Sequence, residues 1–423
     1  MKPYQRDITN TRGWINRMLD LNSSQYHILL GAAGTGKSYT LQQLREQEKM
    51  LITSSTGISA INNNGCTVHS ALGFFDTASL IHKAYVAPDQ GDFNIASSFA
   101  DLIRRIADNY KVLVIDEVSM LPMEIINVII DVITRCKINL KLLLVGDFCQ
   151  LPVVVSASDE YKAHPFYQSK FLPIFKLTYL NEIKRQTNLE FITALNHVRM
   201  GEAKLALDFF NSNVGFHKSI DNDYEGTTIM ATNKAVDEYN QRNLQRLPGE
   251  SKVYRKKVRG KSSPDWKSIP SEIELKEGAR VVLLSNNIPE YANGDLGTVI
   301  AVYQSCIHVR IHRTDKTHII TFVNRENKGP LDLVPVGWCS YLPVRLAYAL
   351  TVHRTQGMTL DHVQAQLGSS FLSHLSGGLY TILSRIRDYN NLRLVGSKDY
   401  FIRSCYLDVE TRSFMQRLCL TSD

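Results

Sequence analysis

An eight-residue segment near the start of the chain limits most strongly what this sequence can fold into. Gly31-Ala32-Ala33-Gly34-Thr35-Gly36-Lys37-Ser38 matches the pattern GxxxxGK[ST] without a gap. It follows an apolar run, Tyr26–Leu30, that is typical of a buried strand, and a helical pattern opens at Tyr39. A glycine-rich turn between a strand and a helix is the context in which this pattern binds phosphates. The segment therefore predicts an α/β domain with a nucleotide site, and a chance glycine-rich turn is the less favoured interpretation.

The residue types in this segment suit a nucleoside triphosphate. Glycines let backbone N–H groups turn toward the phosphates, and the N-terminus of the following helix favours their negative charge. Lys37 is expected to reach the β- and γ-phosphates, and the Ser38 hydroxyl to hold Mg²⁺. The predicted ATP-binding residues of the segment are Gly31, Gly34, Thr35, Gly36, Lys37, Ser38 and Tyr39.

Two adjacent carboxylates supply the second half of the predicted site. The apolar run Val112–Ile115 ends in Asp116 and Glu117. Because ligands bind beyond the carboxyl ends of parallel strands, this pair is expected beside the phosphate-binding segment. Asp116 is predicted to hold Mg²⁺ and Glu117 to orient or deprotonate the attacking water. An isolated Asp-Glu pair is usually a solvated turn, but after a buried strand in such a chain it indicates nucleotide hydrolysis.

Short apolar strands alternate with helical patterns along the chain, which favours parallel α/β sheets. Four strands are predicted for a first sheet and four for a second, so two similar sheets in tandem are expected. The first set is Tyr26–Leu30, Met50–Thr53, Val112–Ile115 and Leu142–Val145, and the second is Thr228–Ala231, Leu346–His353, His362–Leu367 and Leu392–Val395.

Two stretches interrupt this alternation. Residues 73–107 contain Phe74, Phe75, Phe93 and Phe99 and are predicted to form a small insertion, and residues 277–340 have the pattern of an inserted β-barrel. The predicted first domain then comprises residues 1–72 and 108–187, and the second comprises residues 188–276 and 341–423. The basic stretch Lys252–Lys267 lacks apolar periodicity and is predicted to be a loop that neutralises phosphates or is merely solvated.

Composition restricts the compartment and the partners. The net charge of +7 suits a polyanion partner without demanding one. The seven cysteines are widely spaced and form no CxxC pair, which predicts reduced thiols in an intracellular protein. No apolar run approaches the roughly 20 residues needed to span a bilayer, so no membrane segment is expected. The expected location is cytoplasmic or nucleoid-associated, or nuclear or mitochondrial in a eukaryote, and the expected state is a monomer.

Three further segments offer groups that could respond to the γ-phosphate. Gly146–Pro152 (GDFCQLP) ends a predicted strand and carries Gln150, which is placed to sense the phosphate. Leu180–Gln186 carries Arg185, and Leu383-Ser384-Arg385 carries Arg385. Each arginine is a candidate arginine finger, a group that raises turnover by about 10³–10⁵ in phosphoryl transfer. A single arginine in a basic chain is more often a surface charge, so the interpretation of these two depends on the sequence segments that flank them.

The sequence segments around these arginines resemble, in their order and residues, the motifs of PIF-type DNA helicases, the superfamily 1B relatives of RecD and the phage helicase Dda. The resemblance runs from about Gly31 to Gly396 and includes the barrel segments Lys276–Leu284 and Asn293–Val299. The segments that carry it elsewhere are Thr53–Ala60, Thr67–Ser70, Gly146–Pro152, Ile183–Gln186, Val352–Thr359 and Leu379–Arg385.

The resemblance implies two RecA-like domains with small inserted subdomains, the second an SH3-like barrel, and ATP bound between the two domains. It also implies 5′→3′ movement along single-stranded DNA and unwinding of duplex or forked DNA, with replication or repair proteins as possible partners. Residues implied to face DNA are Thr56, Thr67, His69, His353 and Thr355, and those implied to face the nucleotide are Gln356, Arg385 and, at the adenine, Gln5.

One departure and several alternatives accompany this resemblance. The family places a glutamine shortly before the Leu379–Arg385 segment, where this chain has Gly377 and Gly378. A translocase that does not separate strands would share every motif, and RNA could replace DNA as the track. A binding subunit without catalysis is disfavoured because Lys37, Ser38, Asp116, Glu117 and Arg385 are all present. Phe74, Phe75 and Phe93 are candidates for a strand-separating wedge, although a small core is the commoner role for such residues.

Overall fold

The protein is described by a computed structural model that covers residues 24–55, 59–60, 63, 65–74, 76–86, 94–153, 163–263, 266, 269–285, 287, 290–291, 294–327 and 334–420. Contacts divide the chain into two compact units. The first unit comprises residues 1–185 and 407–423, and the second comprises residues 186–406. The chain therefore passes between the units twice, at Arg185–Gln186 and at Tyr406–Leu407.

The first unit is built on a six-stranded parallel sheet in the order β3-β2-β6-β7-β1-β8. Its strands are β1 (Tyr26–Gly31), β2 (Met50–Ser54), β3 (Cys66–Thr67), β6 (Val112–Asp116), β7 (Lys141–Gly146) and β8 (Lys176–Leu180). The central strands are continuous apolar runs because helices cover both faces of such a sheet. All four strands predicted for this sheet are confirmed, and all end at one edge, where the polar motifs begin.

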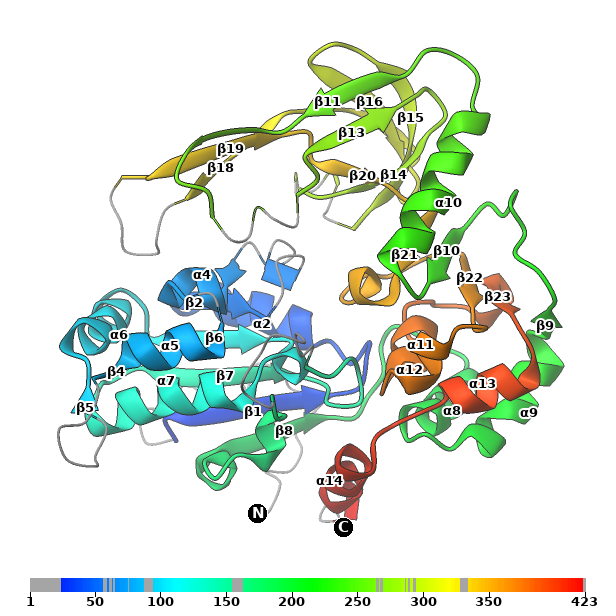
Figure 1. Ribbon diagram of the computed structural model, residues 1–423. Helices are drawn as coiled ribbons and strands as arrows, with labels where there is room; N and C mark the ends of the chain where they lie inside the picture. Colours follow the sequence, from blue (N-terminus) through cyan, green and yellow to red (C-terminus); the bar gives the residue numbers. More distant parts are fainter. Residues whose placement is uncertain are drawn as a thin grey trace. The chain divides into compact units, whose positions relative to one another are not determined.

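Helices pack around this sheet (Figure 1). Leu41 and Leu44 of α2 join the core that the central strands form. Helix α7 buries seven apolar side chains, all of them Ile or Val, and contacts α5 and α6. The helices and remaining short elements of this unit are α2 (Lys37–Arg45), α4 (Val68–Leu72), α5 (Thr77–Ala84), β4 (Tyr85–Val86), β5 (Asn94–Ile95), α6 (Ser97–Asn109), η1 (Val118–Met120), α7 (Met123–Arg135), η2 (Phe166–Gln168), η3 (Leu172–Ile174) and α14 (Val409–Leu420).

The second unit contains another parallel sheet, in the order β21-β10-β22-β23-β9. Its strands are β9 (Phe216–His217), β10 (Thr227–Met230), β21 (Ala349–Thr351), β22 (Val363–Gln366) and β23 (Leu392–Val395). The helices of this unit are α8 (Leu189–Arg199), α9 (Ala203–Asn213), α10 (Asn233–Arg246), η5 (Val352–Thr355), α11 (Ser370–His374), α12 (Gly378–Leu383), η6 (Tyr389–Asn391) and α13 (Lys398–Ser404).

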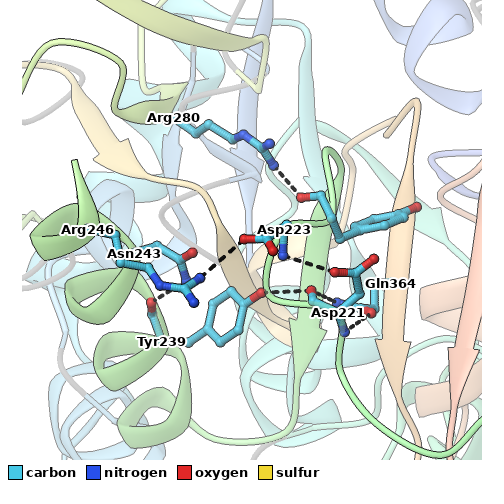
Figure 2. Close-up of polar contacts among 8 residues, drawn as sticks. Asp221, Asp223, Tyr239, Asn243, Arg246, Arg280 and Gln364 are labelled. Atoms are coloured by element: carbon cyan, nitrogen blue, oxygen red, sulfur yellow. Dashed lines mark hydrogen bonds and ion pairs between the residues drawn. The ribbon is translucent and has the colours of Figure 1, made fainter. Parts of the chain in front are cut away.

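A polar network, buried at Gln364 and exposed at Asp221 and Asp223, ties β22 to the segment before β10 (Figure 2). The Gln364 side chain accepts a hydrogen bond from the Asp221 backbone N–H (2.8 Å) and donates one to the Asp221 carbonyl (3.0 Å). Tyr239 of α10 donates to the same carbonyl (3.3 Å), and Arg246 forms an ion pair with Asp223. These bonds satisfy the buried amide of Gln364 and hold the exposed loop at residues 221–223 against the sheet.

An antiparallel barrel lies within the second unit, as the resemblance implies. Its five-stranded sheet runs in the order β17-β16-β15-β14-β20 and encloses an apolar core. The strands are β14 (Arg280–Leu283), β15 (Leu296–Val302), β16 (Cys306–Ile311), β17 (Lys316–Thr321) and β20 (Val344–Leu346). The barrel sheet therefore includes β20, which lies beyond the predicted limit of residue 340, so only the carboxyl part of the predicted strand Leu346–His353 belongs to the parallel sheet.

The basic stretch Lys252–Lys267 is not a plain loop, which corrects the prediction. It contains β11 (Lys252–Arg255), which pairs with β13 (Glu272–Leu275), and β12 (Lys257–Gly260), which pairs with β19 (Gly337–Tyr341). Strand β19 also pairs with β18 (Val323–Asn327). Apart from Tyr254, which is buried in the barrel core, the side chains of β11 and β12 are exposed, so these strands show no repeating apolar pattern in the sequence.

The last helix, α14, packs in the first unit, whereas the sequence pattern placed it with the second sheet domain. The Phe414 ring stacks on Tyr167 with centroids 4.8 Å apart and meets the Phe148 ring edge-on at 5.7 Å. The Tyr167 and Thr411 hydroxyls are 2.9 Å apart. The remaining predicted domain limits stay predictions. Across the described part of the chain, no helix has the length and apolar character needed to cross a membrane.

Candidate active site

The phosphate-binding segment joins β1 to α2 with the geometry that the sequence predicts. Gly36 lies before the first residue of α2 with φ +89°, a left-handed conformation that glycine adopts without strain. Lys37 opens the helix, and its ammonium Nζ donates to the carbonyl oxygens of Gly31 (2.8 Å) and Ala32 (3.0 Å). The positive charge therefore lies against the backbone of the loop that is expected to receive phosphates. Tyr39 is exposed on the same helix.

Two close approaches fix this loop against the neighbouring strand. A Cβ at Gly31 would lie 2.8 Å from the Leu180 carbonyl oxygen, so only glycine fits beside the end of β8. Four residues later the Lys184 backbone N–H donates to the Gly34 carbonyl at 2.7 Å. This bond brings the segment of the candidate finger Arg185 next to the phosphate-binding loop within the first unit. The loop is therefore held by the chain that precedes Arg185 as well as by α2.

Asp116 and Glu117 end β6 at the same sheet edge. The Glu117 backbone has φ +55°, in the left-handed region that non-glycine residues rarely occupy. Such strain persists where surrounding structure enforces it, commonly at functional sites. Here Ser55 enforces the turn, because its backbone N–H donates to the Asp116 carbonyl (3.2 Å) and its hydroxyl to the Glu117 carbonyl (2.9 Å).

The environment of Asp116 is suited to a cation. Its carboxylate accepts from the Asn63 amide (2.7 Å) and from the Glu117 N–H (2.9 Å), and the residue is 6% exposed. Desolvation, reinforced by the charge of Glu117, raises the pKa of Asp116 to about 7. A cation nearby would favour the ionised carboxylate, and the Asp116 and Ser38 oxygens are donors of the kind that Mg²⁺ prefers. Sequence reasoning missed Asn63, because nothing local indicates that its amide reaches β6.

The Gly146–Pro152 segment follows β7 at this edge. A Cβ at Gly146 would meet the Val118 backbone N at 3.0 Å, so glycine allows β7 to end close against η1. The Asp147 carboxylate accepts from the Cys149 N–H (3.2 Å), and Asp147 and Gln150 are both buried. Cys149 is fully buried, so its thiol packs in the interior and is not exposed. Gln150 therefore sits on a turn that its own motif rigidifies.

The residues that the resemblance assigns to DNA in the first unit have local structural partners. The Thr67 hydroxyl caps α4 by accepting from the Ser70 N–H (3.1 Å). The His69 ring packs on Phe74 with centroids 4.6 Å apart. Phe74 is buried, which favours a core role for it over that of an exposed wedge. The other candidates here, Gln5, Thr56, Phe75 and Phe93, lie outside the described residues.

In the second unit, Arg385 is buried just after α12. Its guanidinium donates from Nε to the Thr381 carbonyl (2.8 Å) and from Nη2 to the Ser384 hydroxyl (2.8 Å). Its backbone carbonyl accepts from the Leu360 N–H (3.0 Å), which ties it to the segment after Gln356. Gln356 is also buried. The motif residues around positions 356 and 385, distant in sequence, are thus brought together.

An open groove of about 430 Å³ lies beyond the carboxyl ends of β10 and β21. Burial lowers the pKa of His353, which keeps its imidazole neutral near pH 7, and burial also lowers the pKa of Arg354. The Phe371 ring lies 6.3 Å from that of His353, centroid to centroid. Thr355 is buried, and its hydroxyl donates to the Val352 carbonyl (2.8 Å). The groove is lined by Ala231, Thr232, Asn233, Thr351, His353, Arg354 and Phe371.

Comparison with known proteins agrees with this geometry. Residues 16–219 match a family model described as an AAA domain. The chain is 28% identical to the ATP-dependent DNA helicase Pif1 of Campylobacter jejuni, covering 92% of this chain and 94% of that protein. Over most of its length the chain is therefore similar to proteins named Pif1 helicase.

Two further proteins named Pif1 are similar to this chain. The chain is 30% identical to the ATP-dependent DNA helicase PIF1 of Xenopus laevis over 88% of its own length, and spans 59% of that longer protein. The crystal structure of Bacteroides sp Pif1 in complex with ADP-AlF4 superposes with a TM-score of 0.76, at 24% identity, over 97% of this chain and 96% of that one. That likeness confirms the predicted fold of two parallel-sheet domains with inserted elements.

Proposed function

We propose that this chain is an ATP-dependent DNA helicase that moves 5′→3′ on single-stranded DNA and separates duplex strands. One observation carries the proposal: four motifs meet at one sheet edge of the first unit. These are the phosphate-binding loop, the Asp116–Glu117 turn, the Gly146–Pro152 turn and the Leu180–Gln186 segment. The last of these is held at the loop by the bond from the Lys184 N–H to the Gly34 carbonyl. A site so built is suited to bind a triphosphate and to respond to the loss of its γ-phosphate.

Each group has a definite task in the proposed hydrolysis. Lys37 stabilises negative charge on the β- and γ-phosphates, and Glu117 orients the attacking water and accepts its proton. Gln150 hydrogen-bonds near the γ-phosphate, so its rigid turn reports whether that phosphate is present. Mg²⁺ neutralises charge on the phosphate oxygens when bound, and Ser38 and Asp116 are the residues that would hold it. The strained backbone at Glu117 supports the role of base, because it fixes the carboxylate in place before substrate arrives.

Arginines from both units would complete the cycle. Arg185 and Arg385 are proposed to stabilise charge on the transferring phosphate, and Gln356 to contact the nucleotide. Nucleotide binding would then favour one relative arrangement of the two units, and product release would favour another. Different affinities of these two states for DNA would drive movement along the strand. Gln5 is retained as the candidate adenine contact and Tyr39 as part of the phosphate-binding segment.

The groove of the second unit is the proposed DNA track on that side. Arg354 would pair with a phosphate, Phe371 would stack on a base, and neutral His353 would donate a hydrogen bond. The buried Thr355 bonds to the Val352 carbonyl and so stabilises η5, which carries His353. Thr56, Thr67 and His69 are proposed to bind the strand from the first unit. We further propose that the protein acts as a monomer inside the cell, alongside replication or repair proteins.

One experiment tests the proposal directly. ATP hydrolysis is measured with and without single-stranded DNA, beside unwinding of duplexes that carry either a 5′ or a 3′ tail. Strong stimulation, with unwinding from the 5′ tail alone, is the expected result. Stimulation without strand separation would identify a translocase, and stimulation by RNA alone would change the track. Hydrolysis that responds to neither nucleic acid would overturn the proposed function and leave only the nucleotide site.

A further inference from the structure

The chain crosses from the first unit to the second through a connection with an anchor on each side. On the first side, the Lys184 N–H is bonded to the Gly34 carbonyl of the phosphate-binding loop at 2.7 Å. On the second side, the first residue of the second unit is Gln186. Arg185 alone lies between these two residues, so the candidate finger of the first unit is also the connection itself.

The Gln186 side chain provides the second anchor. Its amide Nε2 donates to the Ile386 carbonyl at 2.6 Å and lies 3.4 Å from the Ser384 carbonyl. These two carbonyls belong to the residues that immediately precede and follow Arg385. Gln186 is 3% exposed, so solvent does not compete for these bonds. One amide group therefore holds the backbone on both sides of the other candidate finger.

Packing alone does not account for a glutamine at this position. Its Oε1 atom is buried and has no hydrogen-bond partner among the described residues. An unsatisfied buried oxygen costs about 1–3 kcal/mol, a cost that an apolar side chain of similar length would avoid. An amide flip does not help, because both neighbouring carbonyls need a donor. The donor function toward residues 384 and 386 is what the glutamine provides and an apolar residue does not.

We propose that Gln186 is a positioning residue that holds Arg385 in place and links it to Arg185. The inference rests on the proposed function, since it concerns the two arginines that are assigned to phosphate. Gln186 does not contact the nucleotide itself. Its side chain bonds to the turn after α12 that carries Arg385. Its backbone directly follows Arg185, so the same residue joins Arg185 to that turn. Any reorientation of one unit against the other must be taken up, on this side, by the backbone of Arg185.

A chain of anchors from one unit to the other follows from these contacts. Gly34 holds Lys184, the peptide chain joins Lys184 through Arg185 to Gln186, and Gln186 holds the Arg385 turn. A shift of the phosphate-binding loop is thereby passed to both arginines at once rather than to each independently. Without the Gln186 amide, Arg385 keeps its own bonds to Thr381 and Ser384, but its turn is no longer tied to the connection. The expected defect is therefore in turnover and not in nucleotide binding.

The test uses the full-length chain and Gln186→Met, which keeps length and removes the donor. Single-turnover ATP hydrolysis with enzyme in excess is measured with saturating single-stranded DNA, together with the KM for ATP at steady state. Gln186→Met is expected to lower the rate about 10- to 100-fold, the effect of misplacing a catalytic group by about 1 Å, with KM nearly unchanged. The same change in an Arg385→Ala background is expected to alter the rate less than about twofold, because residues acting as a unit are not additive.

Gln364→Met is the matched control. Gln364 is fully buried in the second unit, and its amide donates to the Asp221 carbonyl (Figure 2) and to the Thr228 hydroxyl (3.1 Å). The Gln364→Met substitution is expected to lower the melting temperature while the hydrolysis rate stays at the wild-type value. Gln186→Leu repeats the test should Gln186→Met melt below the control.

Three outcomes decide the inference. A rate loss confined to Gln186 variants and absent in the Arg385→Ala background supports it. A wild-type rate in Gln186→Met and Gln186→Leu, or the same loss with and without Arg385, overturns it. Wild-type hydrolysis that no nucleic acid stimulates would instead defeat the proposed function, and the Gln186 comparison is then made on DNA-independent hydrolysis.

Discussion

Removing the Phe414 ring should detach the last helix from the first unit. Phe414 is 6% exposed, stacks on Tyr167 and meets the edge of Phe148, which belongs to the Gly146–Pro152 turn. Asp408 caps the helix by accepting from the Thr411 N–H at 2.8 Å, so the helix has a defined start of its own. Phe414→Ala leaves this cap intact and removes the principal aromatic anchor of the helix.

The magnitude follows from the burial and the ring contacts. Truncating a buried phenylalanine to alanine costs about 3–5 kcal/mol, which includes the cavity that remains. The two aromatic pairs account for about 0.5–1.5 kcal/mol each of that cost. A docking free energy lowered by about 4 kcal/mol corresponds to an opening equilibrium about 10³-fold larger. The loss is local, because α14 is terminal and can open without unfolding the sheet.

Hydrogen exchange of the α14 backbone amides measures this directly. Exchange in Phe414→Ala is expected to be about 10³-fold faster along α14, while the amides of β1 and β7 keep their wild-type protection. Val409→Ala is the control on the same helix, because Val409 is 78% exposed and its truncation should change stability by less than about 0.5 kcal/mol. Equal exchange of α14 in Phe414→Ala and wild type would refute the docking of this helix on Tyr167 and Phe148.

Three further predictions concern the site and the sheet below it. Lys37→Ala should lower ATP hydrolysis at least about 10³-fold while fluorescence anisotropy still detects binding of single-stranded DNA; loss of both would contradict the separate roles. Glu117→Gln should retain nucleotide binding but lose about 10²–10⁴ in single-turnover rate, and a wild-type rate would remove Glu117 from the role of base. Burial lowers the pKa of His27 to about 4, so the unfolded chain binds more protons below pH 6.5. Stability should fall by about 2 kcal/mol from pH 7 to pH 5, and chemical denaturation of His27→Gln should lack this loss.

The nucleotide site could be predicted almost completely because its signals are local. A strand, a glycine turn and a helix follow one another within residues 26–45, and Asp116 and Glu117 directly end an apolar strand. The rule that ligands bind beyond the carboxyl ends of parallel strands then places these segments together without any knowledge of contacts. The contact of Asn63 with Asp116 could not be predicted, because the two residues are 53 positions apart and the segment around Asn63 has no apolar pattern. The same holds for the Lys184–Gly34 bond.

The features that the sequence concealed share one physical cause. Strand β12 pairs with β19, about 80 residues further on, and with both its faces largely exposed it carries no period-two apolar signal. The apolar residues of helix α14 indicate a buried face, but their periodicity does not indicate which of the two units that face packs against. Gln186 bonds to residues about 200 positions away, through a side chain that a motif would assign to the phosphate site. Each depends on a pairing between distant segments, which a local pattern does not encode. The division of labour in this chain therefore follows a physical line: the groups expected to bind and hydrolyse ATP are specified locally, whereas the groups proposed to tie the two units together are specified only by the folded chain.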